Sequence, residues 1–167
     1  MTAGIVIAPF SNSDIRDWPI AHFIELIRLL VGQRIHLIGS ANQFNRAAEI
    51  VRPFDAGRVH NHCGQFTWAE TRKLLASADC VIGNNSGIAH LAASLGKPTI
   101  CLFGGAHHRL EWGPRGPRVR IVTLTVPCAP CGRHRAADCP FALQCLAGID
   151  AAHIAELALE LMQPTGG

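Results

Sequence analysis

The sequence predicts an α/β protein with a Rossmann-like, doubly wound parallel sheet and a cysteine-rich loop. Three observations lead to this fold class. Short runs of apolar and β-branched residues recur along the chain, amphipathic segments with helical spacing separate them, and glycine stands at many of the boundaries. Because neighbouring parallel strands need crossover connections, this alternation places helices on both faces of one sheet.

Five segments are expected to be strands that are buried on both faces, since each is short, continuous and apolar. They are residues 5–7, 35–38, 80–82, 99–103 and 120–122. Ligands of doubly wound sheets bind beyond the carboxyl ends of the strands. The loops after Ile7, Ile38, Ile82 and Phe103 are therefore the expected places for chemistry.

Five further segments place apolar residues three and four positions apart, as amphipathic helices do. They are residues 20–31, 43–51, 68–77, 88–95 and 151–162. Thr67 and Glu70 form a capping-box pattern before the third of these helices, and Asp150 is expected to cap the last one.

The composition is that of a globular protein. The 167 residues fit one domain, so residues 1–167 are expected to form a single Rossmann-like unit, and a hydrophobic content of 49% excludes global disorder. The charged residues are scattered along the chain and give a net charge of +3. This mild positive charge suits phosphorylated ligands or an anionic membrane surface and is too weak to indicate binding to nucleic acid. Without a transmembrane run or a leader pattern, the expected location is the cytoplasm, with peripheral contact at the inner membrane as an option.

The loop Gly83-Asn84-Asn85-Ser86-Gly87 is a candidate anion site because it leads from a strand directly into a helix. Glycine lets the main chain approach a phosphate, Ser86 can donate from its hydroxyl, and His90 lies one helical turn further on. These residues alone are equally consistent with an ordinary helix N-cap and a buried histidine.

The wider segment, residues 83–104 followed by Glu111-Trp112-Gly113-Pro114, resembles the donor-binding signature of glycosyltransferase family nine, the ADP-heptose:lipopolysaccharide heptosyltransferases. Residues 9–19 resemble the family's phosphate loop and residues 39–43 its ribose loop, so the resemblance covers nearly the whole chain. It implies the C-terminal, donor-binding half of a GT-B glycosyltransferase.

Carried over position by position, the resemblance implies that Ser86, Gly87 and the helix start hold the diphosphate of a nucleotide-sugar donor. His90 would lie near the sugar and the phosphates. Ser11 and Ser13 lie in the loop that would face the same phosphates.

Three positions depart from the family pattern. Arg16 stands where a lysine is common and keeps the positive charge, although a solvated surface arginine is the alternative. Gln43 stands where a glutamate often accepts hydrogen bonds from the ribose, which implies weaker nucleotide affinity. Asn85 replaces an aspartate that is thought to engage the sugar, and this change indicates an altered donor preference or a reduced activity.

The function implied is binding of ADP-heptose, or a related nucleotide sugar, during heptose transfer to lipopolysaccharide core or a surface glycoconjugate. The family carries its acceptor site and catalytic aspartate on an N-terminal domain, so a partner half is expected and no base is assigned here. Asp14, Asp17 and Glu111 are candidates by position only. A nucleotide-binding or assembly module with reduced catalysis, and a transferase that uses a UDP- or GDP-sugar, stay open, as does homo-oligomerisation.

Four of the seven cysteines crowd residues 128–145 and suggest a metal site. Cys128 and Cys131 are two residues apart, and Cys139 and Cys145 follow, so four thiolates could hold structural zinc or iron. Some heptosyltransferases that modify surface proteins have a four-cysteine iron finger in this domain. Two disulfides and four unligated thiols are the alternatives, and no catalytic metal is expected.

Overall fold

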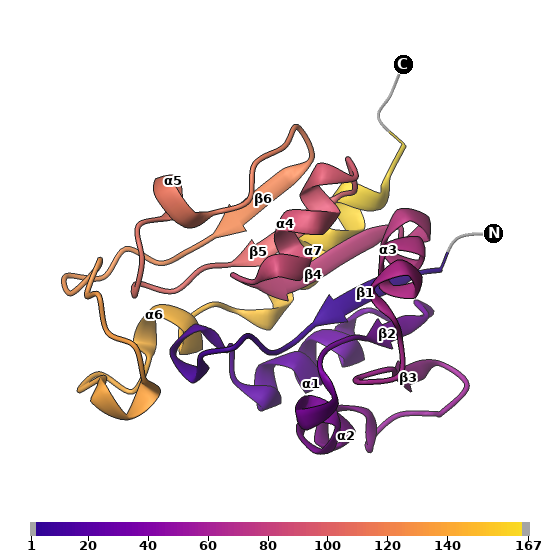
Figure 1. Ribbon diagram of the computed structural model, residues 1–167, viewed down its shortest axis with the longest axis horizontal. Helices are drawn as coiled ribbons and strands as arrows, with labels where there is room; N and C mark the ends of the chain where they lie inside the picture. The colour runs from indigo at the N-terminus through magenta and orange to yellow at the C-terminus, as the bar shows by residue number, and fades with distance from the viewer. Residues whose placement is uncertain (1–2, 165–167) are drawn as a thin grey trace.

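The centre of the protein, seen in a computed structural model that describes residues 3–164, is a parallel six-stranded sheet (Figure 1). The strand order is β3-β2-β1-β4-β5-β6, and it reverses direction between β1 and β4. The strands are β1 (Ile5–Ala8), β2 (Ile35–Leu37), β3 (Val59–Asn61), β4 (Cys80–Asn84), β5 (Thr99–Leu102) and β6 (Val119–Val122). This is the Rossmann-like order that the sequence predicted.

Helices cover both faces of the sheet (Figure 1). One face carries α1 (Ile20–Leu29), α2 (Phe44–Val51) and α7 (Ala151–Met162), and the other carries α3 (Trp68–Ser77) and α4 (Gly87–Ser94). Two short helices, α5 (Arg109–Trp112) and α6 (Gln144–Ala147), lie in the connections. The 3₁₀ turns are η1 (Asp14–Arg16), η2 (Ala41–Gln43) and η3 (Ala136–Asp138).

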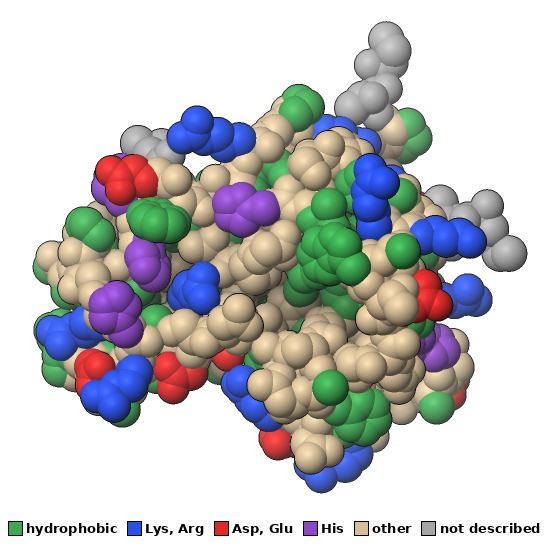
Figure 2. All heavy atoms as spheres, in the orientation of Figure 1, with side chains coloured by type: hydrophobic (Ala, Val, Ile, Leu, Met, Phe, Trp, Pro, Cys, Tyr) green, Lys and Arg blue, Asp and Glu red, His purple; other side chains and the backbone are tan. Residues whose placement is uncertain are grey.

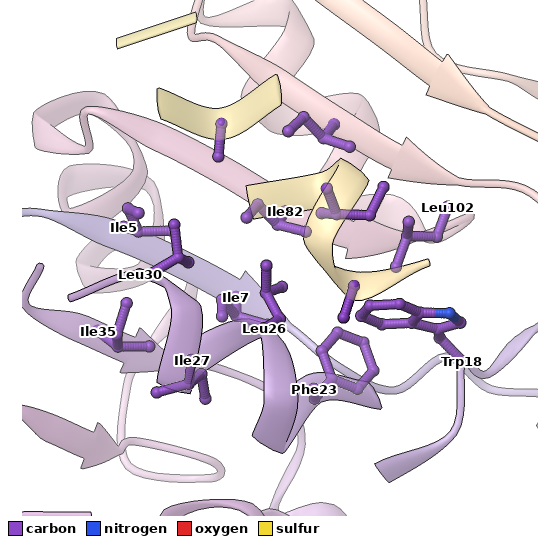
Figure 3. Close-up of a cluster of buried hydrophobic side chains, with 14 of the residues drawn as sticks. Ile5, Ile7, Trp18, Phe23, Leu26, Ile27, Leu30, Ile35, Ile82 and Leu102 are labelled. Carbon is purple, nitrogen blue, oxygen red and sulfur yellow. The ribbon is translucent and has the colours of Figure 1, made fainter. Parts of the chain in front are cut away.

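Alternating side chains of β1 enter two separate cores, as the period of two in a strand requires. Ile5 and Ile7 pack against α1 in the larger core (Figure 3), whereas Val6 packs on the α3 and α4 side. Trp18 is almost fully buried, stands edge-on to the Phe23 ring with centroids 4.9 Å apart, and donates its indole N–H to a backbone carbonyl. The loop after β1 is therefore fixed to the start of α1.

The predicted strands and helices are all present. The bounds of α3 and α7 match the prediction, the Thr67 hydroxyl accepts from the Glu70 N–H, and Asp150 accepts from the N–H of Ala152. Three elements, β3, α5 and α6, were not predicted from the sequence. Strand β4 continues two residues further than expected, through Asn84. Between residues 3 and 164 no helix is long and apolar enough to cross a membrane.

Candidate functional site

The candidate site is a cavity of about 400 Å³ at the carboxyl ends of β1, β2 and β4. It opens beside the β1–β4 neighbours, where the strand order reverses and where doubly wound sheets bind their ligands. In the space-filling view a hollow lies near the middle of this face (Figure 2). The cavity lining comes from the loops after β1 and β2, from the β3–α3 connection and from the start of α4.

The start of α4 presents unsatisfied donors to this cavity. Ser86 is the N-cap residue in an extended conformation, and its side chain makes no capping hydrogen bond. Its Oγ is buried and has no partner among the described residues. A Cβ built at Gly87 would meet nothing within 4 Å, so the first turn of the helix faces open space. These features suit an anion at the positive end of the helix dipole.

Arg16 brings a positive charge to the same cavity. Its side chain is half-buried, and one terminal guanidinium N–H donates to the carbonyl oxygen of Asn85 over 3.1 Å. The Nε of Arg16 is buried and, in the described part of the chain, has no hydrogen-bond partner. Arg16 therefore lines the cavity, and a freely solvated surface arginine is not what the structure shows.

A buried carboxylate organises the loop that carries Arg16. Asp17 Oδ1 accepts the backbone N–H of Ser11 at 2.8 Å and lies 2.9 Å from the Ser11 hydroxyl, while Oδ2 pairs with Arg46 at 3.2 Å. The Asn84 side chain accepts from the backbone N–H of Trp18 and donates to the backbone carbonyl of Pro9. Sequence reasoning treated Asp17 as a positional candidate only and gave Asn84 no role.

Ser11 and Gln43 are part of this framework. Gln43 Oε1 accepts the N–H of Ser40 at 3.0 Å, and its Nε2 donates to the Ser11 carbonyl at 3.3 Å. Ser11 and Gln43 both line the cavity, but these bonds join the loop after β1 to the loop after β2. The Gln43 amide that was expected to serve the ribose therefore also has a structural task.

Aromatic side chains line the other end of the cavity. His62 stacks on Phe66 with ring centroids 4.5 Å apart and planes inclined by 19°, and Trp68 is 64% exposed. Burial lowers the pKa of His62, and the neighbouring His60 lowers it further, so the ring favours its neutral form. Together with Ile38 these residues form walls suited to a flat, apolar-faced group.

The remaining predicted donor-binding residues lie elsewhere. Ser13 donates its hydroxyl to the carbonyl of His134 at 2.8 Å, and Asn85 is 7% exposed; both line a second cavity on the far side of Arg16. His90 is exposed on α4 and lines neither cavity. The structure thus brings Ser11, Arg16, Gln43, Ser86 and Gly87 together at one cavity.

The predicted metal ligands Cys128, Cys131, Cys139 and Cys145 are not assembled. All four thiols are free and half-exposed, and nowhere in residues 3–164 do three or more His, Cys, Asp or Glu side chains form a group that could hold an ion. The segment is held by hydrogen bonds instead: the Cys131 N–H donates to Gly105, and the Ser13 hydroxyl donates to His134. As the described residues are arranged, these thiols do not form the group that a closed tetrahedral site needs.

The sheet order and the cavity at its reversal define the class of this protein: a Rossmann-like α/β protein. The sequence profile described as "Glycosyltransferase family 9 (heptosyltransferase)" matches residues 2–139. The chain belongs to this family, and the resemblance noted in the sequence is confirmed.

Individual relatives agree with this assignment. Lipopolysaccharide heptosyltransferase 2 of Salmonella typhimurium is 29% identical over 114 residues, which cover 65% of this chain and 32% of the relative. The structure of E. coli ADP-heptose LPS heptosyltransferase II superposes with a TM-score of 0.80 at 22% identity over 97% of this chain and 47% of that one. E. coli heptosyltransferase WaaC with ADP gives 0.75 at 23% identity, over 96% and 44%.

A more distant structural relative contains iron. The dodecameric glycosyltransferase TibC from enterotoxigenic E. coli H10407 superposes with a TM-score of 0.68 at 18% identity, over 96% of this chain and 45% of TibC.

This chain spans about a third of the length of the curated relatives it matches and under half of the length of the solved structures.

Proposed function

We propose that this chain binds the nucleotide-sugar donor of a heptosyltransferase. The nucleoside lies in the cavity between β1, β2 and β4, and the diphosphate lies between Arg16 and the start of α4. In this role the chain stabilises the negative charge that collects on the departing diphosphate. ADP-heptose is the proposed donor, and the acceptor is lipopolysaccharide core or a related surface glycoconjugate.

One observation carries this proposal: two buried donors, Arg16 Nε and Ser86 Oγ, are unsatisfied within the described residues, and both residues line the same cavity. A buried polar group without a partner costs about 1–3 kcal/mol, so such pairs mark places where a ligand completes the hydrogen bonding. Both groups donate, and a phosphate accepts. The adjacent helix start adds a favourable dipole.

The nucleoside end follows from the shape and chemistry of the remaining lining. A base inserted beside Phe66 and Trp68 buries its faces against aromatic rings, which suits a flat heterocycle. The Ser40 hydroxyl, in the loop after β2, lines the cavity and donates to the side-chain oxygen of Asn42, so it can accept a hydrogen bond from a ribose hydroxyl. Two solved relatives support a nucleotide-sugar ligand, since WaaC was determined with ADP and TibC with ADP-D-β-D-heptose.

Acceptor binding is proposed to lie on a separate N-terminal half, with residues 1–167 acting as one donor-binding unit. In the described part of the chain, no Asp or Glu lines the first cavity or the one beyond Arg16. The nearby Asp17 carboxylate is buried beneath the loop and accepts the Ser11 N–H. Deprotonating an acceptor hydroxyl needs a base. That base is proposed to come from the partner half.

Calorimetric titration of the purified chain with ADP, UDP and GDP tests the proposal. ADP should bind, and Arg16→Gln should weaken its binding about 10- to 100-fold, because a charge-assisted hydrogen bond contributes about 1.5–3 kcal/mol. Arg28→Gln, which removes an exposed arginine from α1, is the matched control and should leave affinity unchanged.

If UDP or GDP binds more strongly than ADP, the proposed site stands, but its donor is a UDP- or GDP-sugar. If none of the three nucleotides binds, the donor-binding function is wrong. The second candidate, an assembly module with lost catalysis, would then be favoured, and it is motivated by Asn85 at the position of the family's aspartate.

A further inference from the structure

The turn that carries Arg16 is tied to a segment that lies more than 120 residues later in the sequence. Arg16 is the last residue of the 3₁₀ turn η1, which begins at Asp14 and follows Ser13. The Ser13 hydroxyl donates to the His134 carbonyl, and the Ala136 N–H donates to Asp14 Oδ1, both at 2.8 Å. Two hydrogen bonds therefore join the loop after β1 to the cysteine-rich segment, which is orange in Figure 1.

The same segment is also fixed to the loop after β5. The backbone N–H groups of residues 131–132 donate to the carbonyls of residues 105–106, at 2.9 and 3.0 Å. Residues 131–136 therefore bridge the loop after β5 and the loop after β1, and we call them the strap. His134 of the strap lines the cavity on the far side of Arg16.

The position of the Arg16 guanidinium depends on the backbone of η1. One terminal N–H donates to the Asn85 carbonyl at 3.1 Å, whereas Nε is buried and has no hydrogen-bond partner in the described part of the chain. The turn itself is held by the Arg16 N–H, which donates to the Ser13 carbonyl at 3.0 Å, and by the buried side chain of Ile15. A shift of η1 would therefore move the guanidinium within the cavity.

Asp14 links this turn to the strap without reaching a ligand. Its side chain is exposed and lines neither of the two cavities beside Arg16. Its negative charge would repel a diphosphate, so attraction of the ligand does not explain a carboxylate two residues before Arg16. The carboxylate instead accepts the Ala136 N–H, and the backbone carbonyl of Asp14 accepts the Asp17 N–H at 3.2 Å.

We propose that Asp14 is a positioning residue of the donor site. By accepting the Ala136 N–H, it fixes η1 against the strap and holds Arg16 where the guanidinium meets the diphosphate. The strap thereby contributes to donor affinity although Asp14 does not line the site. This inference rests on the proposed function, since it needs a diphosphate at Arg16.

Two variants of Asp14 isolate the hydrogen bond from the charge. Asp14→Ala and Asp14→Asn remove the same charge, but only the asparagine keeps an oxygen that can accept the Ala136 N–H. A net hydrogen bond corresponds to about a three- to tenfold change in an equilibrium constant. In calorimetry of the purified chain with ADP, Asp14→Ala should therefore bind about three- to tenfold more weakly than Asp14→Asn.

Asp55 offers a matched control. It is exposed in the loop between α2 and β3, and its Oδ1 accepts the Gly57 N–H at 3.0 Å, so it makes the same kind of bond away from the cavities. Asp55→Ala and Asp55→Asn should bind ADP equally well. Urea unfolding should show little difference between the two Asp14 variants, because the bond lies at the surface.

Repeating the comparison in an Arg16→Gln background separates positioning from a general structural effect. If Asp14 acts through Arg16, then Asp14→Ala and Asp14→Asn should bind ADP equally once the guanidinium is gone. A difference of the same size in that background would overturn the inference. Equal ADP affinities of the two Asp14 variants in the chain that keeps Arg16 would overturn it as well.

Amide hydrogen exchange measured by NMR tests the link to the strap without any ligand. The Arg16 N–H should exchange about three- to tenfold faster in Asp14→Ala than in Asp14→Asn, because the turn opens more often when its tie is lost. Equal exchange rates would overturn the inference and leave the proposed function untouched. Faster exchange in a chain that binds no ADP would instead overturn the proposed function, and the role of Asp14 in donor binding with it.

Discussion

At the scale of single residues, Asp17 determines how the loop after β1 is held. It is 7% exposed, and its two oxygens receive the Ser11 N–H, the Ser11 side chain and the Arg46 guanidinium. Arg46 also lies over the Phe10 ring, 4.0 Å from its centroid. The carboxylate therefore fixes the turn that carries Arg16 without reaching the ligand cavity itself, which makes it a positioning residue.

Asp17→Asn should destabilise the fold and weaken ADP binding in parallel. An amide keeps the shape but loses the charge that strengthens the Ser11 bonds, so the free energy of unfolding should fall by about 1–3 kcal/mol. The Arg46 pair adds little, because the arginine side chain is 45% exposed. Urea unfolding and ADP titration measure the two effects.

Asp138→Asn provides the control for this variant, because it removes an exposed carboxylate that pairs with Arg135 on the surface. It should change neither the unfolding midpoint nor ADP affinity. An Asp17 variant with unchanged ADP affinity would show that the loop conformation does not depend on the carboxylate.

Residue types predicted the candidate site only in part. Ser86 and Gly87 follow from a loop that enters a helix, since that geometry is local and readable from sequence, whereas Arg16 was expected only from the family resemblance. The partners of Asn84, which are Trp18 and Pro9, lie more than 60 residues from it in the sequence, and Arg46 lies 29 residues from Asp17, so no local pattern indicates these contacts. His90 was expected near the donor; it lies exposed on α4, one helical turn after Ser86, and lines neither cavity.

At the scale of elements, the edge strand β3 shows where pattern reading stops. Its three residues, Val59–Asn61, include only one apolar side chain, so no continuous run marks a strand. Parallel pairing with β2 nevertheless sets His36 directly opposite His60. Since side chains at alternate positions share a face, His62 joins them just after the strand.

These three histidines form a stacked group with ring centroids 5.1–5.8 Å apart. His36 Nδ1 and His62 Nε2 are 2.9 Å apart, so one nitrogen must donate and the other accept, which two protonated rings cannot do. The other groups that affect the pair are His60, the positive Arg34, and the Gln65 side chain, which hydrogen-bonds His62. Burial lowers the pKa of both His36 and His62, and the neighbouring positive charges lower it further.

Stability should consequently depend on pH below about 6.5. The unfolded chain takes up protons at these histidines near pH 6.5, whereas the folded chain resists protonation until the pH is lower. The free energy of unfolding should therefore be fully retained above pH 6.5 and fall as the pH drops below it. Urea unfolding at several pH values should give a shallower slope for His36→Gln.

His153→Gln removes an exposed histidine from α7 and is the control. Its free energy of unfolding should change with pH as steeply as that of the unmodified chain. A His36→Gln variant with the same slope as the unmodified chain would mean that the stacked group is not the source of the pH dependence.

At the scale of the whole molecule, the described residues suit one of the two tasks of the proposed glycosyl transfer, which is stabilising the leaving group. Positive charge and N–H donors gather at the cavity beside Arg16, which suits the leaving diphosphate. The carboxylates near it are already engaged: Asp17 holds Ser11, and Asp14 accepts from Ala136. Glu111 lies exposed on α5 and lines neither cavity. The arrangement fits the proposed stabilisation of the leaving group, and these described carboxylates offer no free base.

The purified chain should therefore bind ADP-heptose but transfer its heptose no faster than a sample without enzyme. General base catalysis contributes about 10²–10⁴-fold, and the orientation of the acceptor contributes more, so a chain that lacks both should show no product. Mass spectrometry of a heptose-accepting lipopolysaccharide core incubated with ADP-heptose measures this. Full-length E. coli lipopolysaccharide heptosyltransferase 2 serves as the positive control for acceptor and donor quality. Robust transfer by the 167-residue chain alone would mean that a base and an acceptor site lie within it, and would remove the reason for assigning those tasks to a partner half.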